Sequence, residues 1–441
     1  MIINNKINAA PQDEITQSNL FVDLFCGAGG LSTGAHLVGK KILACVNHDP
    51  IAIESHLANH PKTVHLTEDV RDMVVIPKLK SIINGRPFNL WASLECINFT
   101  CAKGGMKKDL SSRTLPMCLL KYVKELQPET LWIENVKQFR NWGPLDLNTM
   151  QEIKERRGEY YKNWLDHLSA LGYEYDYRLL NGADFGSHQN RTRYFAQFRK
   201  RKNFKWPSPT HGESSKLLPY NTAKDILQLE NIGESIFGRK KPYVEKTLKR
   251  IYEGLIKFKD EPIFLDEYYG NGRAQSVHKP IPVITTKDRY SVIHSIFIDQ
   301  QYGNSSAASI NQPINTITTN PKFSICYVLN PQYSSKGSSL NQPMPTIIAR
   351  QDKAPLGLIH GISGPMIGIN EKDSHYTKLI KEFMNKNGIS DIRKRPLNIT
   401  ELKRAQGFND DYILKGSQQD QKKFIGNAVD VTMAKALLKI A

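Results

Sequence analysis

The sequence has no apolar run that approaches the roughly 18 residues needed to span a bilayer. Its opening stretch, residues 1–19, is also too polar for a secretory signal peptide, so we expect a cytoplasmic protein with no membrane partner. The six cysteines include no C-x-x-C pair, which argues against both a zinc site and a disulfide framework. We therefore predict reduced thiols and no bound metal.

Acidic residues are few beside basic ones. The 441 residues include 43 Asp and Glu against 60 Lys and Arg, which gives a formal charge of +17. Such a charge favours a polyanionic partner, because Lys and Arg release counterions when they bind phosphates. On charge alone nucleic acid is the first candidate and an anionic membrane surface the weaker one, and of these two only nucleic acid is expected as the partner. The basic run 199–202 is either a solvated surface or a phosphate contact.

Between residues 20 and 198, short apolar runs alternate with amphipathic ones, which is typical of strand–helix–strand units wound into a parallel sheet. Strands are predicted at 21–24, 42–46, 63–66, 90–94, 131–133 and 194–198, and helices at 31–38, 52–59, 115–126 and 161–171. The closing segment 424–440 is predicted to form one more helix. The length suggests two or three domains.

Helix signals thin out between residues 206 and 396, where Pro, Gly, Asn and Ser become frequent. A repeat runs through residues 269–286, 302–319 and 333–349. This pattern indicates a separate β-rich module. Its polar loops, which include Arg273, Asn304 and Lys336, are suited to reading base edges. The alternative is that the repeats only build a small sheet.

The apolar strand 90–94 runs directly into a polar loop that begins with Glu95 and Cys96. In strand–helix folds, reactive groups sit at the carboxyl ends of parallel strands, where the loops open into the ligand crevice. Cys96 is therefore a candidate nucleophile. Taken alone it is more often a small core residue, because buried thiols are inert unless their surroundings stabilise the thiolate.

A glycine-rich turn after the first strand indicates a ligand site. The segment 23–31 opens a helix, and its glycines let backbone amides approach a ligand closely. Asn47 and His48 end the next strand, where a nucleotide site needs a partner for ribose hydroxyls. Asp69 and Val70 come after the third strand, and the Asp69 carboxylate suits an adenine amino group. Because the G-x-G-x-x-G spacing is absent, an adenosine ligand ranks above a nicotinamide or flavin dinucleotide.

Two further segments place polar groups at strand ends. Glu134 follows the strand 131–133, where its carboxyl group can bond a base lodged in the crevice; the alternative is a helix cap. Gln189, Arg191 and Arg193 lie on one face if their segment is extended, because strand side chains alternate. Three planar donors aimed one way suit phosphate or base recognition.

In this order the motifs resemble those of the DNA (cytosine-5)-methyltransferases. Residues 23–30 resemble the family's S-adenosylmethionine loop, Cys96 its nucleophile, 134–136 its Glu-Asn-Val motif, 189–193 its Gln-x-Arg-x-Arg motif, 404–408 its Leu-Gln-Gly-Phe element and 425–429 its Gly-Asn-Ala-Val element. In that family the variable stretch between the fourth and fifth of these blocks is the target recognition domain. Here that stretch holds the repeats.

The resemblance implies an α/β fold, a Rossmann-like doubly wound methyltransferase sheet with a smaller β-rich target recognition domain. It implies a catalytic domain over 1–200, a target recognition domain over 201–411 with three repeats at about 264–350, and a C-terminal helix over 412–441 that returns to the catalytic domain. The implied reaction is methyl transfer from S-adenosylmethionine to carbon 5 of cytosine in double-stranded DNA at a specific sequence, through a covalent Cys96 adduct on a flipped base. A monomer is expected, with a cognate restriction endonuclease as a separately acting partner.

The resemblance assigns three roles to site residues. Those expected in catalysis are Cys96, Glu134, Arg191 and Arg193. Those expected at S-adenosylmethionine are Phe25, Gly27, Ala28, Gly29, Gly30, Asn47, His48, Asp69, Val70 and Asn427. Those expected at DNA are Gln189, Lys103, Arg113, Arg273, Asn304 and Lys336.

Two residues depart from the family pattern. Glu95 stands where a proline normally precedes the nucleophile, and its carboxylate disfavours a neighbouring thiolate. Asn47 replaces an acidic residue, although its carbonyl still accepts a hydroxyl hydrogen. A DNA-binding homologue with weak or no catalysis is therefore one alternative. A methyltransferase acting on transfer RNA is another, against which the long repeat module argues. An amino-group methyltransferase is set aside, because Gln332 breaks the nearest Asn-Pro-Pro-Tyr-like string.

Overall fold

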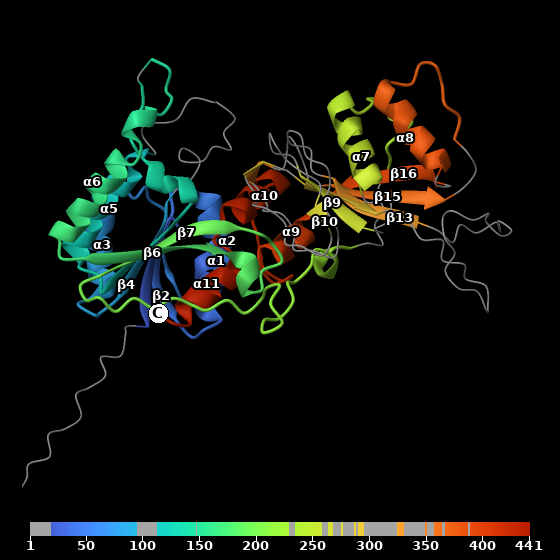
Figure 1. Ribbon diagram of the computed structural model, residues 1–441. Helices are drawn as coiled ribbons and strands as arrows, with labels where there is room; N and C mark the ends of the chain where they lie inside the picture. Colours follow the sequence, from blue (N-terminus) through green and yellow to red (C-terminus); the bar gives the residue numbers. More distant parts are fainter. Residues whose placement is uncertain are drawn as a thin grey trace, which may run out of the picture.

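The computed structural model describes residues 19–94, 113–146, 148–228, 234–257, 367–386 and 389–441, together with seven short strands between residues 263 and 363. These parts form two lobes, the first around residues 20–200 and the second around 234–396. Helices α9 (Ile399–Ala405) and α10 (Gln418–Asn427) lie between the lobes (Figure 1). Within the described ranges, no helix is both long enough and apolar enough to cross a membrane.

A seven-stranded sheet forms the centre of the first lobe, in the order β3-β2-β1-β4-β5-β7-β6. Its strands are β1 (Leu20–Leu24), β2 (Lys41–Val46), β3 (Val64–Leu66), β4 (Asn89–Ser93), β5 (Thr130–Asn135), β6 (Glu174–Asn181) and β7 (Thr192–Arg199). β1 to β5 pair in parallel, and β7 is antiparallel to both neighbours. The six predicted strands and the doubly wound α/β sheet are confirmed. The sequence did not indicate β6, because its side chains are partly exposed and mixed in polarity.

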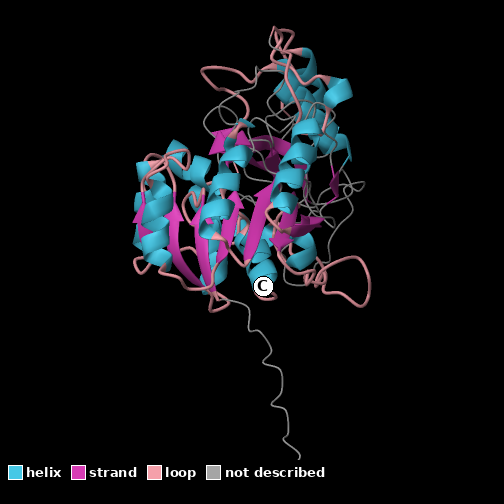
Figure 2. Ribbon diagram, turned by 90° about the vertical axis from the view of Figure 1, so that its left-hand side faces the viewer, coloured by secondary structure: helices cyan, strands magenta, loops and turns pink. Residues whose placement is uncertain are grey.

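Helices cover both faces of this sheet (Figure 2). α3 (Val75–Ile83), α5 (Leu115–Leu126) and α6 (Glu159–Ala170) pack on one face, and α1 (Gly30–His36) and α11 (Val431–Leu438) pack on the other. α2 (Pro50–Asn59) connects β2 to β3. The alternation of strand side chains divides the core, since Val22 of β1 joins the first cluster and Phe21 joins the second. The four predicted helices are present with small shifts at their ends, and α3 was not predicted.

The end of the chain contradicts the predicted single helix over 424–440. It forms α10 and α11 instead, with Ala428 extended between them. Asp430 begins the second helix, because its carboxylate accepts a hydrogen bond of 2.9 Å from the Met433 amide. α11 then lies against α1, where Gly34 allows so close an approach that an added Cβ would lie 2.5 Å from the Ala434 side chain. α11 is thereby part of the first lobe.

The second lobe contains another seven-stranded sheet, in the order β10-β9-β12-β13-β15-β16-β8. Its strands are β8 (Glu234–Ser235), β9 (Ile263–Glu267), β10 (Gln275–Ser276), β12 (Tyr290–His294), β13 (Ser324–Leu329), β15 (Gly357–Ser363) and β16 (Ile389–Pro396), while β11 (Thr286–Lys287) pairs separately with β14 (Ala349–Arg350). Most of the predicted repeat stretch at about 264–350 lies outside the described residues.

Two helices of the second lobe contradict the expected scarcity of helix between 206 and 396. α7 (Glu245–Lys257) and α8 (His375–Lys386) pack together over the sheet (Figure 1). Each buries apolar residues at helical spacing: Leu248, Ile251 and Leu255 in α7, and Ile380, Phe383 and Met384 in α8. The many charged residues on their outer faces hid this pattern in the sequence.

Candidate active site

The parallel strands of the first sheet end at one edge, and the polar segments predicted from the sequence follow them there. The glycine turn follows β1, segments 47–49 and 68–70 follow β2 and β3, and Glu134 lies near the end of β5. The register of the sheet places Glu134 beside Ser93, the last residue of β4. Cys96 comes shortly after Ser93 and lies outside the described residues. The strands that lead into the predicted site segments therefore all end at this edge of the sheet.

The glycine turn has two parts with different roles. Phe25 and Gly27 both have left-handed backbone conformations, with φ of 62° and 52°, and both are half-buried. An added Cβ on Gly27 would meet nothing within 4 Å, so this residue faces open space that a ligand can enter. The turn is held to the sheet by the Cys26 amide, which donates to the Val46 carbonyl at 3.2 Å. Gly27 is therefore the position that best fits the predicted cofactor contact.

The remaining glycines of the turn are required by packing against the C-terminal segment. An added Cβ would lie 2.5 Å from the Tyr412 hydroxyl oxygen at Gly29 and 2.3 Å from the Val429 carbonyl oxygen at Gly30. The Tyr412 hydroxyl also donates to the Ala28 carbonyl at 2.5 Å. Ala28, Gly29 and Gly30 are all buried. The small size of these three residues thus allows the turn to pack against the end of the chain.

The segment after β2 presents an amide where the family pattern has an acid. Asn47 is half-buried, and its side-chain oxygen accepts a hydrogen bond of 2.9 Å from the Asp49 amide. Asp49 itself caps α2 by accepting from the Ile51 amide at 3.1 Å, and it pairs with Lys423 at 2.8 Å. The Asp49 carboxylate therefore already binds other groups of the protein. His48 is exposed at the same edge of the sheet.

The segment after β3 contains an ionised acceptor. The Asp69 carboxylate binds the Arg71 guanidinium at 2.9 and 2.5 Å, and this hydrogen bonding is the main cause that lowers the pKa of Asp69. Val70 is buried, and its carbonyl accepts a hydrogen bond of 2.7 Å from the Tyr122 hydroxyl. Asp69 remains about one quarter exposed, so a ligand amino group can share it with Arg71.

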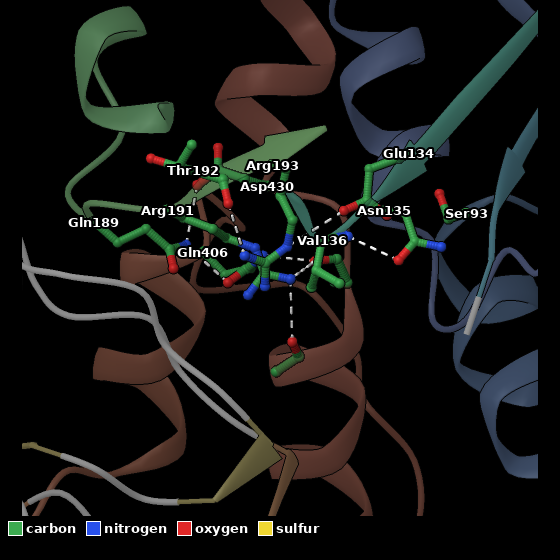
Figure 3. Close-up of polar contacts among 12 residues, drawn as sticks. Ser93, Glu134, Asn135, Val136, Gln189, Arg191, Thr192, Arg193, Gln406 and Asp430 are labelled. Carbon is green, nitrogen blue, oxygen red and sulfur yellow. Dashed lines mark hydrogen bonds and ion pairs between the residues drawn. The ribbon is translucent and has the colours of Figure 1, made fainter. Parts of the chain in front are cut away.

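Glu134 is the carboxyl group buried at the end of β5. Its Oε1 lies 3.4 Å from Nε of Arg193, and these side chains are only 11% and 8% exposed (Figure 3). Burial raises the pKa of Glu134, while the positive charges of Arg193 and then Arg191 act in the opposite direction. The structure therefore holds a buried carboxyl group next to a cation, where burial and charge act on its pKa in opposite directions.

Arg191 and Gln189 face the C-terminal segment rather than Glu134. Arg191 donates to the carbonyls of Ala428 and Gly426 at 3.1 and 3.3 Å. Gln189 is fully buried, and its amide nitrogen lies 2.8 Å from Gln406 Oε1 and 3.0 Å from the Asp430 carboxylate (Figure 3). The motif 189–193 thus joins β7 to the last two motifs of the chain.

The sequence did not predict the role of Asp430. Besides capping α11, this buried carboxylate accepts a 2.5 Å hydrogen bond from Ser187. Burial raises the pKa of Asp430, and the Ser187 hydrogen bond is the largest influence that lowers it. An Asp before an apolar run is the only sequence signal, and that signal predicts a helix cap rather than a network centre.

Two of the residues predicted to contact DNA are buried. Gln189 has no exposed surface and bonds only protein groups in this arrangement. Arg113 is 3% exposed, donates to the Gly143 carbonyl at 2.7 Å and lies 3.7 Å from Glu152. Both side chains bind other groups of the protein in the described structure, and their contact with DNA stays a prediction. Asn427 is exposed at the end of α10. The remaining predicted DNA contacts, Lys103, Arg273, Asn304 and Lys336, lie outside the described residues.

A family model matches nearly the whole chain, and curated relatives match about half of it. A family model for C-5 cytosine-specific DNA methylases matches residues 20–440. Type II methyltransferase M.AquIA of Picosynechococcus sp. is 30% identical over 233 residues, which cover 47% of this chain and 86% of that relative. Type II methyltransferase M.FnuDI of Fusobacterium nucleatum is 29% identical over 206 residues, which cover 45% of this chain and 53% of that relative. The match therefore spans only about half the length of the second relative.

A solved structure shows the same fold. The S. pombe Dnmt2 methyltransferase superposes with a TM-score of 0.50 at 13% identity, over 95% of this chain and 96% of that one. At this identity the likeness concerns the fold alone. The match of the family model from residue 20 to residue 440 shows that the chain belongs to the C-5 cytosine-specific DNA methylase family.

Proposed function

We propose that this protein transfers a methyl group from S-adenosylmethionine to carbon 5 of cytosine in double-stranded DNA, at a specific sequence. The observation that carries the proposal is the buried pair of Glu134 and Arg193, 3.4 Å apart, at the sheet edge where the glycine turn and the strand leading to Cys96 also end. A carboxyl group held there by a cation can hydrogen-bond to a ring nitrogen of cytosine. Names of the similar proteins, which are Type II methyltransferases, support the reaction class.

The residues at the ends of β1, β2 and β3 fit an adenosine-containing methyl donor. Gly27 leaves open space beside a left-handed backbone, Asn47 and His48 lie at the next strand end, and Asp69 offers an ionised acceptor. Hydroxyl and amino groups of a nucleoside are donors that such oxygens accept. When bound, S-adenosylmethionine supplies a methyl group on a positively charged sulfur, and these residues would hold its adenosine part.

The chain's own residues would prepare carbon 5 to accept the methyl group. Cys96, as a thiolate, adds to carbon 6 and breaks the double bond between carbons 5 and 6, which leaves carbon 5 electron-rich. Glu134 bonds or protonates ring nitrogen 3, and burial, which raises the pKa of its carboxyl group, acts in favour of the protonated form. After carbon 5 has taken the methyl group, a base removes the carbon 5 proton, the carbon–sulfur bond breaks and the double bond re-forms.

The two arginines of the 189–193 motif have different parts in this proposal. Arg193 positions Glu134 and balances its charge, so it acts next to the base. Arg191 binds the carbonyls of Ala428 and Gly426 and so fixes the C-terminal segment on which the glycine turn packs. Both arginines were expected in catalysis, and we propose that only Arg193 acts next to the base.

Double-stranded DNA is the proposed partner, and the second lobe is the proposed target recognition domain. The net charge of +17 favours a polyanion, and the target carbon inside stacked DNA can be reached only if the base flips out, which costs a few kcal/mol. We further propose a monomer in the cytoplasm that acts apart from any cognate restriction endonuclease.

The test is methyl transfer from labelled S-adenosylmethionine to DNA and to transfer RNA of the same host. Label in DNA cytosine, with a covalent adduct on DNA that contains 5-fluorocytosine, supports the proposal. Label in transfer RNA alone would favour the RNA alternative. Absence of label in either, from a protein that still binds DNA, would favour the catalytically inactive homologue that Glu95 suggests.

A further inference from the structure

A cluster of sulfur and nitrogen donors lies beneath the glycine turn, and the proposed methyl transfer does not use it. Cys26, Cys45 and His56 are all buried, and one donor atom from each lies within 4.8 Å of the others. We propose that these residues, with His65 as fourth ligand, form a binding site for Zn²⁺. Cys26, Cys45, His56 and His65 are called the thiol–imidazole cluster below.

Two of the separations between donor atoms are close to those around a tetrahedral ion. Nδ1 of His56 lies 3.7 Å from Sγ of Cys45 and 2.9 Å from Nε2 of His65. Zinc–sulfur bonds of about 2.3 Å and zinc–nitrogen bonds of about 2.0–2.1 Å imply sulfur–nitrogen separations near 3.6 Å and nitrogen–nitrogen separations near 3.3 Å. The first distance already matches. The two imidazoles need to separate by only about 0.4 Å when an ion replaces the hydrogen bond between them.

A second layer of hydrogen bonds orients His56 with its free nitrogen toward the cluster. Nε2 of His56 lies 2.9 Å from the Ser32 hydroxyl, and that hydroxyl donates to the Asp23 carboxylate at 3.3 Å. Because the single hydroxyl hydrogen of Ser32 goes to Asp23, the hydrogen of the other bond comes from Nε2. Nδ1 of His56 then carries no hydrogen, and its lone pair faces Cys45 and His65. Metal-binding histidines are typically held in this way, by a donor bond from the other ring nitrogen.

The position of the cluster explains both how an ion enters and what it would do. The four residues come from the turn after β1, from β2, from α2 and from β3, the strand at the edge of the first sheet. His65 is half-buried there, so the cluster has a side open to solvent. Cys26 directly precedes Gly27, and a bound ion would therefore fix the turn proposed to hold the methyl donor.

The ligands form no spacing motif, so a metal site could not be predicted from the sequence. Neighbouring ligands are separated by between 9 and 19 positions along the chain, and only the pairing of β1, β2 and β3 brings them together. A Cys-x-x-Cys search therefore misses the cluster.

The experiment is a zinc titration of the full chain, stripped of metal with a chelator and kept under a phosphine reductant that prevents disulfides. Zinc affinity is measured by competition with a chromophoric chelator, and Co²⁺ is used as a spectroscopic substitute. We expect one equivalent of tight zinc, a Co²⁺ spectrum with tetrahedral and thiolate bands, and a melting temperature that rises with zinc.

Matched variants locate the ion. His65→Ala keeps every thiol and alters a half-buried residue, and it should weaken zinc binding by about 100-fold or more. Ser32→Ala should weaken it by about 10–100-fold, because His56 loses its orienting bond. Exposed His167→Ala in α6 and half-buried Cys118→Ser in α5 should bind zinc as the wild type does.

Two results would overturn the proposal. One is the absence of stoichiometric zinc in a wild-type protein with native circular dichroism. The other is stoichiometric zinc whose affinity His65→Ala and Cys45→Ser leave unchanged, which would place the ion elsewhere in the chain.

Discussion

The pair of Glu134 and Arg193 makes a quantitative prediction about stability. Opposite unit charges 3.4 Å apart attract by about 5 kcal/mol at an effective dielectric constant of about 20. Removing one partner of such a buried pair costs about 3–5 kcal/mol, because the remaining charge is left uncompensated. We expect Arg193→Leu to lower the free energy of unfolding by about 3 kcal/mol above neutral pH, at the low end because Arg191 also favours the Glu134 charge.

The effect should depend on pH in a defined direction. Burial raises the pKa of Glu134 in the folded protein, and Arg193→Leu removes the main opposing influence, so the pKa rises further. A carboxyl group with a raised folded-state pKa stabilises the fold fully at low pH, and this contribution is lost as pH rises from the ordinary glutamate value of about 4.3 through the raised value. The deficit of Arg193→Leu relative to wild type should therefore shrink to about 1 kcal/mol near pH 5.

Urea unfolding at pH 5 and pH 8 measures this, with Glu134→Gln in the Arg193→Leu background as the matched control. The glutamine side chain cannot ionise, so the double variant should recover the part of the deficit that depends on pH. A deficit of Arg193→Leu that is equal at both pH values, and that the second substitution does not reduce, would show that the lost stability does not come from an uncompensated Glu134 charge.

Three further predictions concern the turn, the C-terminal network and the residue before the nucleophile. Gly27→Ala should weaken S-adenosylmethionine binding in calorimetry and lower the free energy of unfolding by about 1 kcal/mol, because an alanine is strained at a φ of 52°. Gly30→Ala should lower the free energy of unfolding by about 3 kcal/mol, because its Cβ would collide with the Val429 carbonyl. Equal losses of stability in the two variants would contradict the idea that Gly27 faces a ligand while Gly30 packs inside the protein. Asp430→Ala should cost about 3 kcal/mol in urea unfolding, since three buried donors lose their acceptor, and a loss under about 1 kcal/mol would show that the network is weak. Glu95→Pro should increase single-turnover methyl transfer, because a carboxylate beside the thiolate is removed; an unchanged rate would mean that the loop already accommodates the charge.

The parts of the fold that the sequence predicted well are those that depend on local pattern. β1, β2, β4 and β5 are runs of buried apolar residues, so they were found. β6 was missed because an edge strand buries little, and α7 and α8 were missed because charged outer faces dilute their apolar stripes.

The parts of the site that the sequence predicted less well depend on partners far along the chain. Gln189 and Arg191 have the donors of recognition residues, yet their acceptors come from the C-terminal segment; Gln189 and Asp430 are 241 positions apart. The same holds for Gly29 and Gly30, whose neighbours are Tyr412 and Val429. Spacing within one motif carries no information about such contacts. Glu134 was placed correctly at its strand end because that position follows from the strand pattern alone.

The proposed reaction requires that Cys96 initiate the methylation of DNA cytosine at carbon 5. Its most direct test is base-resolution mapping of 5-methylcytosine in DNA from a host that expresses the wild-type chain, beside a host that expresses Cys96→Ala at the same level. We expect 5-methylcytosine in one sequence context with the wild type and none above background with the variant. Equal methylation by both proteins, or no methylated context with a folded wild type, would contradict it.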